Sequence, residues 1–251
     1  MTKIIFFIVG LSILGTAFKI FAGPTFIIGV ENQTYLPVFT NENNEYKGFA
    51  RELLDSFARD QGYTFIYRAL PVLRLYASFF GKEIDFKFPD NPNWKRDQRL
   101  DKNVSYSEPV IAFIDGVSVI PERKNDSVED IHILGTVAGF TPWAWMDRIK
   151  ENKVAISENS SFESLVRQTL VRRIDGAYAS LAVINYQLNN VLKKPGALVF
   201  NPHLPYSQDN YYLSTIKQPA VLSEFNSWMN HNQIKIAGLK RQYGVEKGIT
   251  E

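Results

Sequence analysis

Hydrophobic residues along the first third of the chain follow two periods, one typical of strands and the other of helices. Short apolar runs at 25–30, 63–67 and 83–88 predict buried strands. Between them, 48–62 places its apolar residues on one helical face and ends at a glycine, and 71–81 begins at a proline, so both predict helices. This β-α-β-α-β order predicts an α/β layer with parallel strands.

The same alternation continues over the rest of the chain. Ser160 followed by Glu163 predicts a capping box at the start of a helix over 160–173. The other predicted elements are strands at 115–121, 133–139, 153–157, 174–179, 197–200 and 211–217, and helices at 180–190, 219–230 and 233–242. Two such α/β units predict two lobes, with strand ends facing each other across a cleft.

The first 22 residues differ from this pattern. Lys3 precedes the apolar run 4–18, and a small residue, Ala22, closes the segment. A basic start, a short apolar run and a small residue predict a cleaved secretory signal peptide over 1–22, and hence a periplasmic protein. An uncleaved anchor and a buried helix are the alternatives, although about 20 apolar residues are needed to span a membrane.

Charge and composition exclude several functions. The sequence has 28 basic and 26 acidic residues, and without Lys3 and Lys19 the basic count is 28 less 2, or 26. A neutral exported chain has no long-range field for a polyanion, so we expect no nucleic-acid partner. There is no cysteine, which excludes thiolate metal sites and cysteine nucleophiles. The loop after Asp90 lacks the spacing of a calcium loop, and we expect no metal and no cofactor.

Several short motifs occur in an order that resembles one known family. They are Tyr35 and Pro37, Gly48-Phe49 at a helix start, RLYASFFGKEID (74–85), Ser107-Glu108-Pro109, Gly139-Phe140-Thr141 and LVRRIDGA (170–177). Together they resemble the family 3 extracellular solute-binding proteins, the receptors of polar amino-acid ABC transporters. The resemblance extends over 25–245.

This resemblance implies a type II periplasmic binding protein fold, in which two α/β lobes are joined by a hinge and enclose a ligand cleft. Lobe 1 would comprise 24–111 and 205–251, and lobe 2 would comprise 112–204, with the chain crossing between them twice. The lobes would close on a small polar ligand, and an ABC permease or a membrane sensor would recognise the closed form. We expect a monomer.

The resemblance also implies two opposite charges in the cleft. In relatives that bind α-amino acids, an arginine of lobe 1 holds the carboxylate and an aspartate of lobe 2 holds the ammonium. Here Ser180 stands at the position of that aspartate, and Arg96 and Arg99 are both out of register for the arginine. Asp90 and Asn91 replace the small residues that usually follow the strand, and we hypothesise that Asp90 supplies the missing anion. The alternative is that Asp90 caps a loop turn.

The remaining candidates are contacts from both lobes, each weighed against a role in packing or on the surface. Thr141 lies at a predicted helix start, where free N–H groups favour a carboxylate. Trp143 and Trp145 alternate, so both cannot face one core, and Trp143 is the candidate for the cleft. The other candidates are Glu31 after the first strand, Tyr35 as an aromatic wall, Arg74 in the second helix and Tyr178 before Ser180.

Two other functions remain open. Some proteins of this fold are dehydratases, which need a positioned acid, and Glu31 or Asp90 could serve. His132, His203 and His231 lie far apart and form no catalytic motif, so a binding protein is favoured over an enzyme. The same fold also delivers ligands to chemoreceptors and sensor kinases, and the sequence does not separate sensing from transport.

Overall fold

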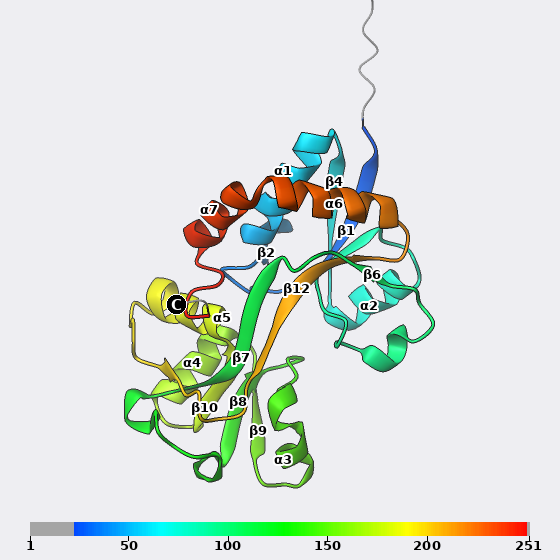
Figure 1. The fold of residues 1–251 in the computed structure, drawn as a ribbon. Coiled ribbons are helices and arrows are strands. Elements are labelled where there is room, and N and C mark those ends of the chain that lie inside the picture. Colours follow the sequence, from blue (N-terminus) through cyan, green and yellow to red (C-terminus); the bar gives the residue numbers. More distant parts are fainter. Residues whose placement is uncertain (1–22, 250–251) are drawn as a thin grey trace, which may run out of the picture.

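A computed structural model describes residues 23–249. The predicted signal peptide, 1–22, lies outside the described residues. The chain forms two α/β lobes, which Figure 1 shows one above the other. No helix within 23–249 combines the length and the apolar character that crossing a bilayer requires.

Lobe 1 is built on a sheet whose parallel part was predicted from the sequence. Strand β1 (Thr25–Glu31) pairs in parallel with β4 (Thr64–Leu70) on one side and with β5 (Phe86–Asp90) on the other. The helices of this lobe are α1 (Phe49–Gln61), α2 (Val72–Phe80), α6 (Pro219–His231) and α7 (Gln233–Tyr243). Gly62 ends α1 with a left-handed φ of 71°, as its position after the last apolar turn predicts.

Lobe 2 repeats the α/β pattern. Strand β8 (Ile133–Val137) pairs in parallel with β9 (Ala155–Asn159) and with β10 (Gly176–Ser180). The short β11 (Val199–Phe200) lies at the edge. The helices are α3 (Met146–Lys150), α4 (Phe162–Leu170) and α5 (Leu181–Tyr186), which continues into one π-helical turn over Gln187–Val191.

Two long antiparallel strands join the lobes. The first part of β12 (Ser207–Thr215) pairs with β7 (Ile111–Val119), whereas its last part pairs with β5 of lobe 1. The far end of β7 pairs with β10 of lobe 2. Strand β12 therefore pairs in both lobes, and the order β5-β12-β7-β10 makes one continuous sheet of the two. Strands β7 and β12 run between the lobes in Figure 1. Side chains in the middle of β7 and β12 lie where the two lobes meet.

Several predicted boundaries were wrong. The side chain of Ser161, not Ser160, accepts the N-cap hydrogen bond from the Ser164 N–H. Glu163 lies one turn before Arg167 and pairs with it, so the predicted capping box is absent. The hairpin of β2 (Thr40–Glu42) and β3 (Glu45–Lys47) was not predicted, although Asn43 and Asn44 at positive φ form its turn.

The C-terminal segment adds a third contact across the hinge to the two predicted crossings. The Glu246 carboxylate accepts a hydrogen bond from the Ala112 N–H at 2.8 Å and another from Lys240 at 2.8 Å. Gly248 lies against Asn185, near the end of α5 in lobe 2. Figure 1 shows the chain descending from α7 to this position. The last helix of lobe 1 is thus anchored on β7.

Candidate ligand-binding site

The end of β5 carries a network of buried charges. Asp90 is fully buried and accepts two hydrogen bonds from Arg99, Nη2 to Oδ1 at 2.7 Å and Nη1 to Oδ2 at 3.1 Å. Lys87 donates to Oδ1 at 3.1 Å, and the Ser214 hydroxyl donates to Oδ2 at 2.5 Å. Each carboxylate oxygen of Asp90 therefore already has two donors.

Aromatic rings enclose the two cations of this network. The Lys87 ammonium lies 4.7 Å from the Tyr76 ring centre and 5.4 Å from that of Trp94. Burial is the largest single effect and lowers the pKa of Lys87. The charges of Asp90, Tyr76 and Glu31 and the hydrogen bond to Asp90 together outweigh burial and raise that pKa above its usual value. Lys87 and Arg99 therefore remain charged, and we consider the network a permanent part of the wall of lobe 1.

The polar residues predicted to contact a ligand from lobe 1 are partly buried in its wall and partly exposed to solvent. Asp90 and Arg99 bind each other inside lobe 1 instead of facing each other across a ligand. Asn91 is buried, and its amide donates to the Asn210 carbonyl at 2.9 Å, which ties the end of β5 to β12. Arg74 and Arg96 are exposed. Neither is brought to the Asp90 network.

The tryptophan pair divides as the alternation predicts. Trp145 is buried, and its indole N–H donates to the Pro205 carbonyl at 3.0 Å. Trp143 is 52% exposed. Thr141 is partly buried and lies two residues before the 3-10 turn Trp143–Trp145, which continues into the five-residue helix α3. Helices this short have a weak dipole, which offers little attraction to a carboxylate.

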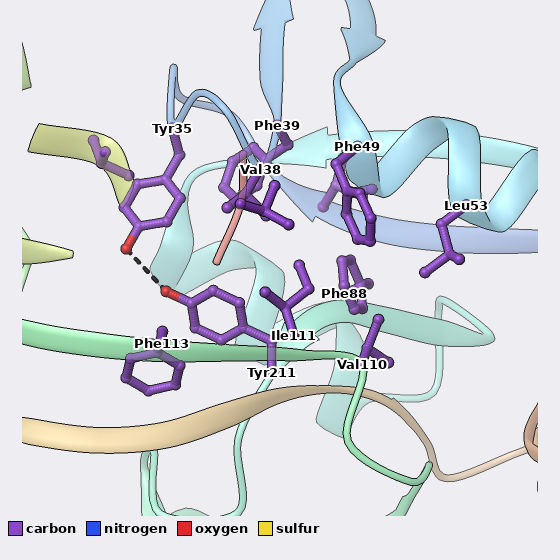
Figure 2. Packing of buried hydrophobic residues seen from close by; sticks show 14 of the residues in the cluster. Tyr35, Val38, Phe39, Phe49, Leu53, Phe88, Val110, Ile111, Phe113 and Tyr211 are labelled. Atoms are coloured by element: carbon purple, nitrogen blue, oxygen red, sulfur yellow. Dashed lines mark hydrogen bonds between the residues drawn. The ribbon is translucent and has the colours of Figure 1, made fainter. Parts of the chain in front are cut away.

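The two lobes meet at Tyr35. Its hydroxyl group shares a hydrogen bond with that of Tyr211 on β12 at 2.9 Å, which Figure 2 shows. Its ring packs on Phe162 at the start of α4, with ring centres 5.3 Å apart. Phe140 links Phe162 to Tyr178, with ring centres 6.3 and 6.2 Å apart. Aromatic side chains from both lobes and from a hinge strand thus converge at one place.

Asp115 lies in the middle of β7, between β10 and β12. It is 6% exposed, and its Oδ1 atom is buried with no hydrogen-bond partner among the described residues. Burial raises the pKa of Asp115 to about 8. Its Cα pairs with that of Ser180 on β10 and with that of Ser207 on β12. Asp115 was missed in the sequence, although a lone acid within the apolar run 110–120 was a signal for it.

Glu31 is a second acid near this junction. It ends β1 and is partly buried, and it accepts a hydrogen bond from the Gln33 amide. Burial raises the pKa of Glu31, and the charge of Lys87 partly offsets this effect. The charge of Glu31 in turn raises the pKa of Tyr35 and Tyr211, as a nearby negative charge does.

The central cluster is thus acidic and aromatic, with Tyr178 and Ser180 of lobe 2 beside Asp115. Tyr178 is buried, and its hydroxyl lies 3.4 Å from that of Ser207. Burial raises the pKa of Tyr178 to about 12, so it stays neutral at physiological pH. Within 23–249, no group of three or more His, Cys, Asp or Glu side chains is placed to hold a metal ion.

Solved structures share this architecture. One is a substrate-binding protein of an ABC uptake transporter from Streptococcus pneumoniae, solved with bound histidine. It is 17% identical, has a TM-score of 0.70, and the match covers 90% of this chain and 95% of that one. The fold is that of the type II periplasmic binding proteins. The predicted fold class is therefore confirmed.

Other type II binding proteins have different roles. An ancestral amino acid-binding protein, described as a precursor of cyclohexadienyl dehydratase, is 16% identical with a TM-score of 0.66, and the match covers 87% of this chain and 95% of that one. A histidine kinase sensor domain is 13% identical with a TM-score of 0.66 and the same coverage. No family model and no curated protein matches the sequence. The likeness therefore establishes the fold, and function has to be argued from the site.

Proposed function

We propose that the protein is an exported solute-binding protein that encloses a small amino-acid-like ligand between its lobes and delivers it to an ABC transporter. The observation that supports this proposal is the meeting of Tyr35 of lobe 1, Phe162 of lobe 2 and Tyr211 of the hinge at one place. A ligand held there would contact every part whose relative position changes on closure, so its binding energy would stabilise the closed form.

The ligand contacts that we propose are the residues around this junction. Glu31 and Tyr35 would contribute from lobe 1, and Tyr178 and Ser180 from lobe 2. Asp90, Asn91 and Arg99 would hold the wall in shape, because their polar groups already bind one another or the protein backbone. Aromatic faces with a few placed polar groups are typical of small-molecule sites.

A thermal-shift screen tests binding. The protein would be heated with each of the twenty L-amino acids, with diamines and with small dicarboxylates. A ligand at 100 times its Kd stabilises the native state by about 2.7 kcal/mol. Substitution of Phe162 by alanine, at the opposite face of the junction, should weaken any such response. Absence of a response to every compound would refute the proposed binding function.

Sensing is the second candidate function, and the similarity to a histidine kinase sensor domain favours it. Transport and sensing both depend on lobe closure, so the binding assay does not separate them. Uptake of the bound ligand by cells that lack this gene would separate them. We expect uptake to fall sharply if the protein serves a transporter and to remain normal if it serves a sensor.

We propose no catalytic role. Asp90 is bound by Arg99 and Lys87 and is poorly placed to act as an acid. Glu31 retains a raised pKa, so a turnover assay with prephenate or arogenate is a useful control. Product formation that Glu31→Gln abolishes would favour a dehydratase over a binding protein.

A further inference from the structure

Asp115 is a buried acid, and one of its carboxyl oxygens has no hydrogen-bond partner among the described residues. Directly paired residues on neighbouring antiparallel strands point to the same face of the sheet, with Cβ atoms about 5 Å apart. Asp115 pairs with Ser180 on one side and with Ser207 on the other. The three side chains therefore form a row across the hinge, with the carboxyl group between two serines.

Three tyrosines lie near this row. The Tyr178 hydroxyl lies 3.4 Å from that of Ser207, and the hydroxyl groups of Tyr35 and Tyr211 are 2.9 Å apart. The charge of Asp115 raises the pKa of all three tyrosines, as a nearby negative charge does. Tyr35 belongs to lobe 1, Tyr178 to lobe 2 and Tyr211 to the hinge strand β12. In Figure 2 the hydroxyl groups of Tyr35 and Tyr211 point toward each other above β7. Asp115 therefore lies where movement of either lobe changes its surroundings.

No described residue compensates for the burial of Asp115. Its pKa is affected by burial alone, and no cation or donor of the described chain lowers it. The nearby cations of lobe 1, Lys87 and Arg99, are instead paired with Asp90. An unpaired carboxyl group is costly to bury, so a site that keeps one is typical of a place where a partner arrives from outside.

We propose that Asp115 binds a protonated amino group of the ligand, and that the ligand is accordingly an amine, either an amino acid or a diamine. This inference rests on the proposed binding function and names its ligand class. The tyrosine hydroxyl groups near Asp115 would accept hydrogen bonds from the ammonium. The hydroxyl groups of Ser180 and Ser207 would accept further hydrogen bonds from it.

The other groups of the cleft support a cation over an anion. Glu31 adds a second acid near the same tyrosines. Arg99, the natural partner for a ligand carboxylate, already binds Asp90 through both terminal nitrogens. Within the described chain, the centre of the cleft thus offers two acids and no unpaired arginine, so a solute without an amino group has no strong partner there.

The test compares matched probes and matched variants. The probes are the twenty L-amino acids, putrescine and cadaverine, with succinate and glutarate as compounds that lack an amine. For each probe that binds, calorimetry gives the Kd for the wild type, Asp115→Asn, Glu31→Gln and Asp97→Asn. Asp97 is an exposed acid in the 3-10 helix Arg96–Arg99, so it controls for loss of a charge as such.

We expect Asp115→Asn to weaken amine binding by at least about tenfold, the loss typical of one charge-assisted hydrogen bond. Asp97→Asn should leave the Kd within twofold. Near-ultraviolet circular dichroism shows whether Asp115→Asn remains folded, and Asp115→Ser serves as a second variant. An unchanged amine Kd in folded Asp115→Asn would overturn the inference.

The pH dependence supplies a readout that a purely structural role would not give. A group with a pKa of about 8 is mostly protonated at pH 7, whereas an alkyl ammonium keeps its proton to about pH 10. Binding should therefore release a proton from Asp115, and affinity should rise by up to about tenfold per unit from pH 6 to pH 8. Glu31 and Lys87 also face this region, and the tyrosines stay neutral. The rise in affinity with pH should therefore persist in Glu31→Gln and disappear in Asp115→Asn.

The outcomes separate the two proposals. Wild-type protein that binds succinate or glutarate but no amine would overturn the role of Asp115 and leave the proposed binding function standing. Wild-type protein that binds no probe at all would overturn both. Amine binding that strengthens with pH in the wild type and not in Asp115→Asn would establish the site.

Discussion

Two buried aspartates of the cleft region differ in one respect, which is the number of partners that the protein gives them. Asp90 in the wall of lobe 1 has Arg99, Lys87 and Ser214 around it. Asp115 on the hinge has a buried oxygen with no partner among the described residues. Both are almost fully buried. A buried carboxylate with partners is explained by the fold, whereas a buried carboxylate without a partner calls for a ligand or another explanation.

The largest expected effect is at Asp90. Asp90→Ala leaves Lys87 and Arg99 buried without a counter-charge, so we expect the free energy of unfolding to fall by about 3–5 kcal/mol. Chemical denaturation measures this, with exposed Asp97→Ala as the control, for which we expect a change below about 0.5 kcal/mol. A loss below about 1 kcal/mol at Asp90 would mean that the network is not needed for stability.

Asp115 should behave in the opposite way. Its pKa is about 8 in the folded protein and about 4 in the unfolded chain, so between these values the folded state binds more protons. The free energy of unfolding therefore falls as pH rises from about 4 to about 8, by at most about 1.4 kcal/mol per pH unit. We expect Asp115→Asn to remove this decline and to be more stable than wild type at pH 7.5.

Denaturation of both proteins at pH 5 and pH 7.5 measures that effect. The difference between the two proteins isolates Asp115 from other titrating groups. If the free energy of unfolding depends on pH equally in the two proteins, the pKa of Asp115 is not raised by folding. Asp115 would then not be an uncompensated buried acid.

A smaller effect is expected at the tyrosine pair above Asp115. Tyr35→Phe and Tyr211→Phe each remove the hydrogen bond between the two hydroxyl groups. We expect each to cost about 1 kcal/mol of unfolding free energy. The double variant should cost little more than one single variant, because the bond is already lost. Additive losses in this double-mutant cycle would show that the hydroxyl groups act independently.

The smallest effect is expected at Arg96, an exposed neighbour of the Asp90 network. Arg96→Ala should change the unfolding free energy by less than about 0.5 kcal/mol, and it should leave ligand affinity unchanged. Arg99→Ala, measured in the same experiment, should be clearly destabilising because Arg99 is paired with Asp90. Equal changes in unfolding free energy for Arg96→Ala and Arg99→Ala would show that the pairing of Arg99 with Asp90 does not stabilise the protein.

Much of the architecture could be predicted from local patterns. The parallel strands β1, β4 and β5 and the helix α1 with its Gly62 cap follow from periodicity and turn chemistry. Helix α4 was predicted, but its capping residue was displaced by one position, since Ser160 and Ser161 have equal capping chemistry in the sequence. The hairpin of β2 and β3 is too short to show a clear period.

The site was less predictable because it depends on partners far apart in the sequence. Asp90 was correctly placed at a strand end, but the sequence did not show that Ser214, more than a hundred residues later, would help to enclose it. In the sequence, Asp115 is one polar residue within a mostly apolar strand. Its position between Ser180 and Ser207 results from strand pairing. Register across a sheet is fixed by tertiary packing.

Local patterns of neighbouring residues thus suffice to predict an α/β chain of two lobes, because strand and helix periods are local properties. Which charges are paired depends on the folded arrangement of distant segments. Coulomb attraction and desolvation depend on distance and burial in space, and these place Asp90 among cations and leave Asp115 without one. The chemistry of the cleft follows from that difference.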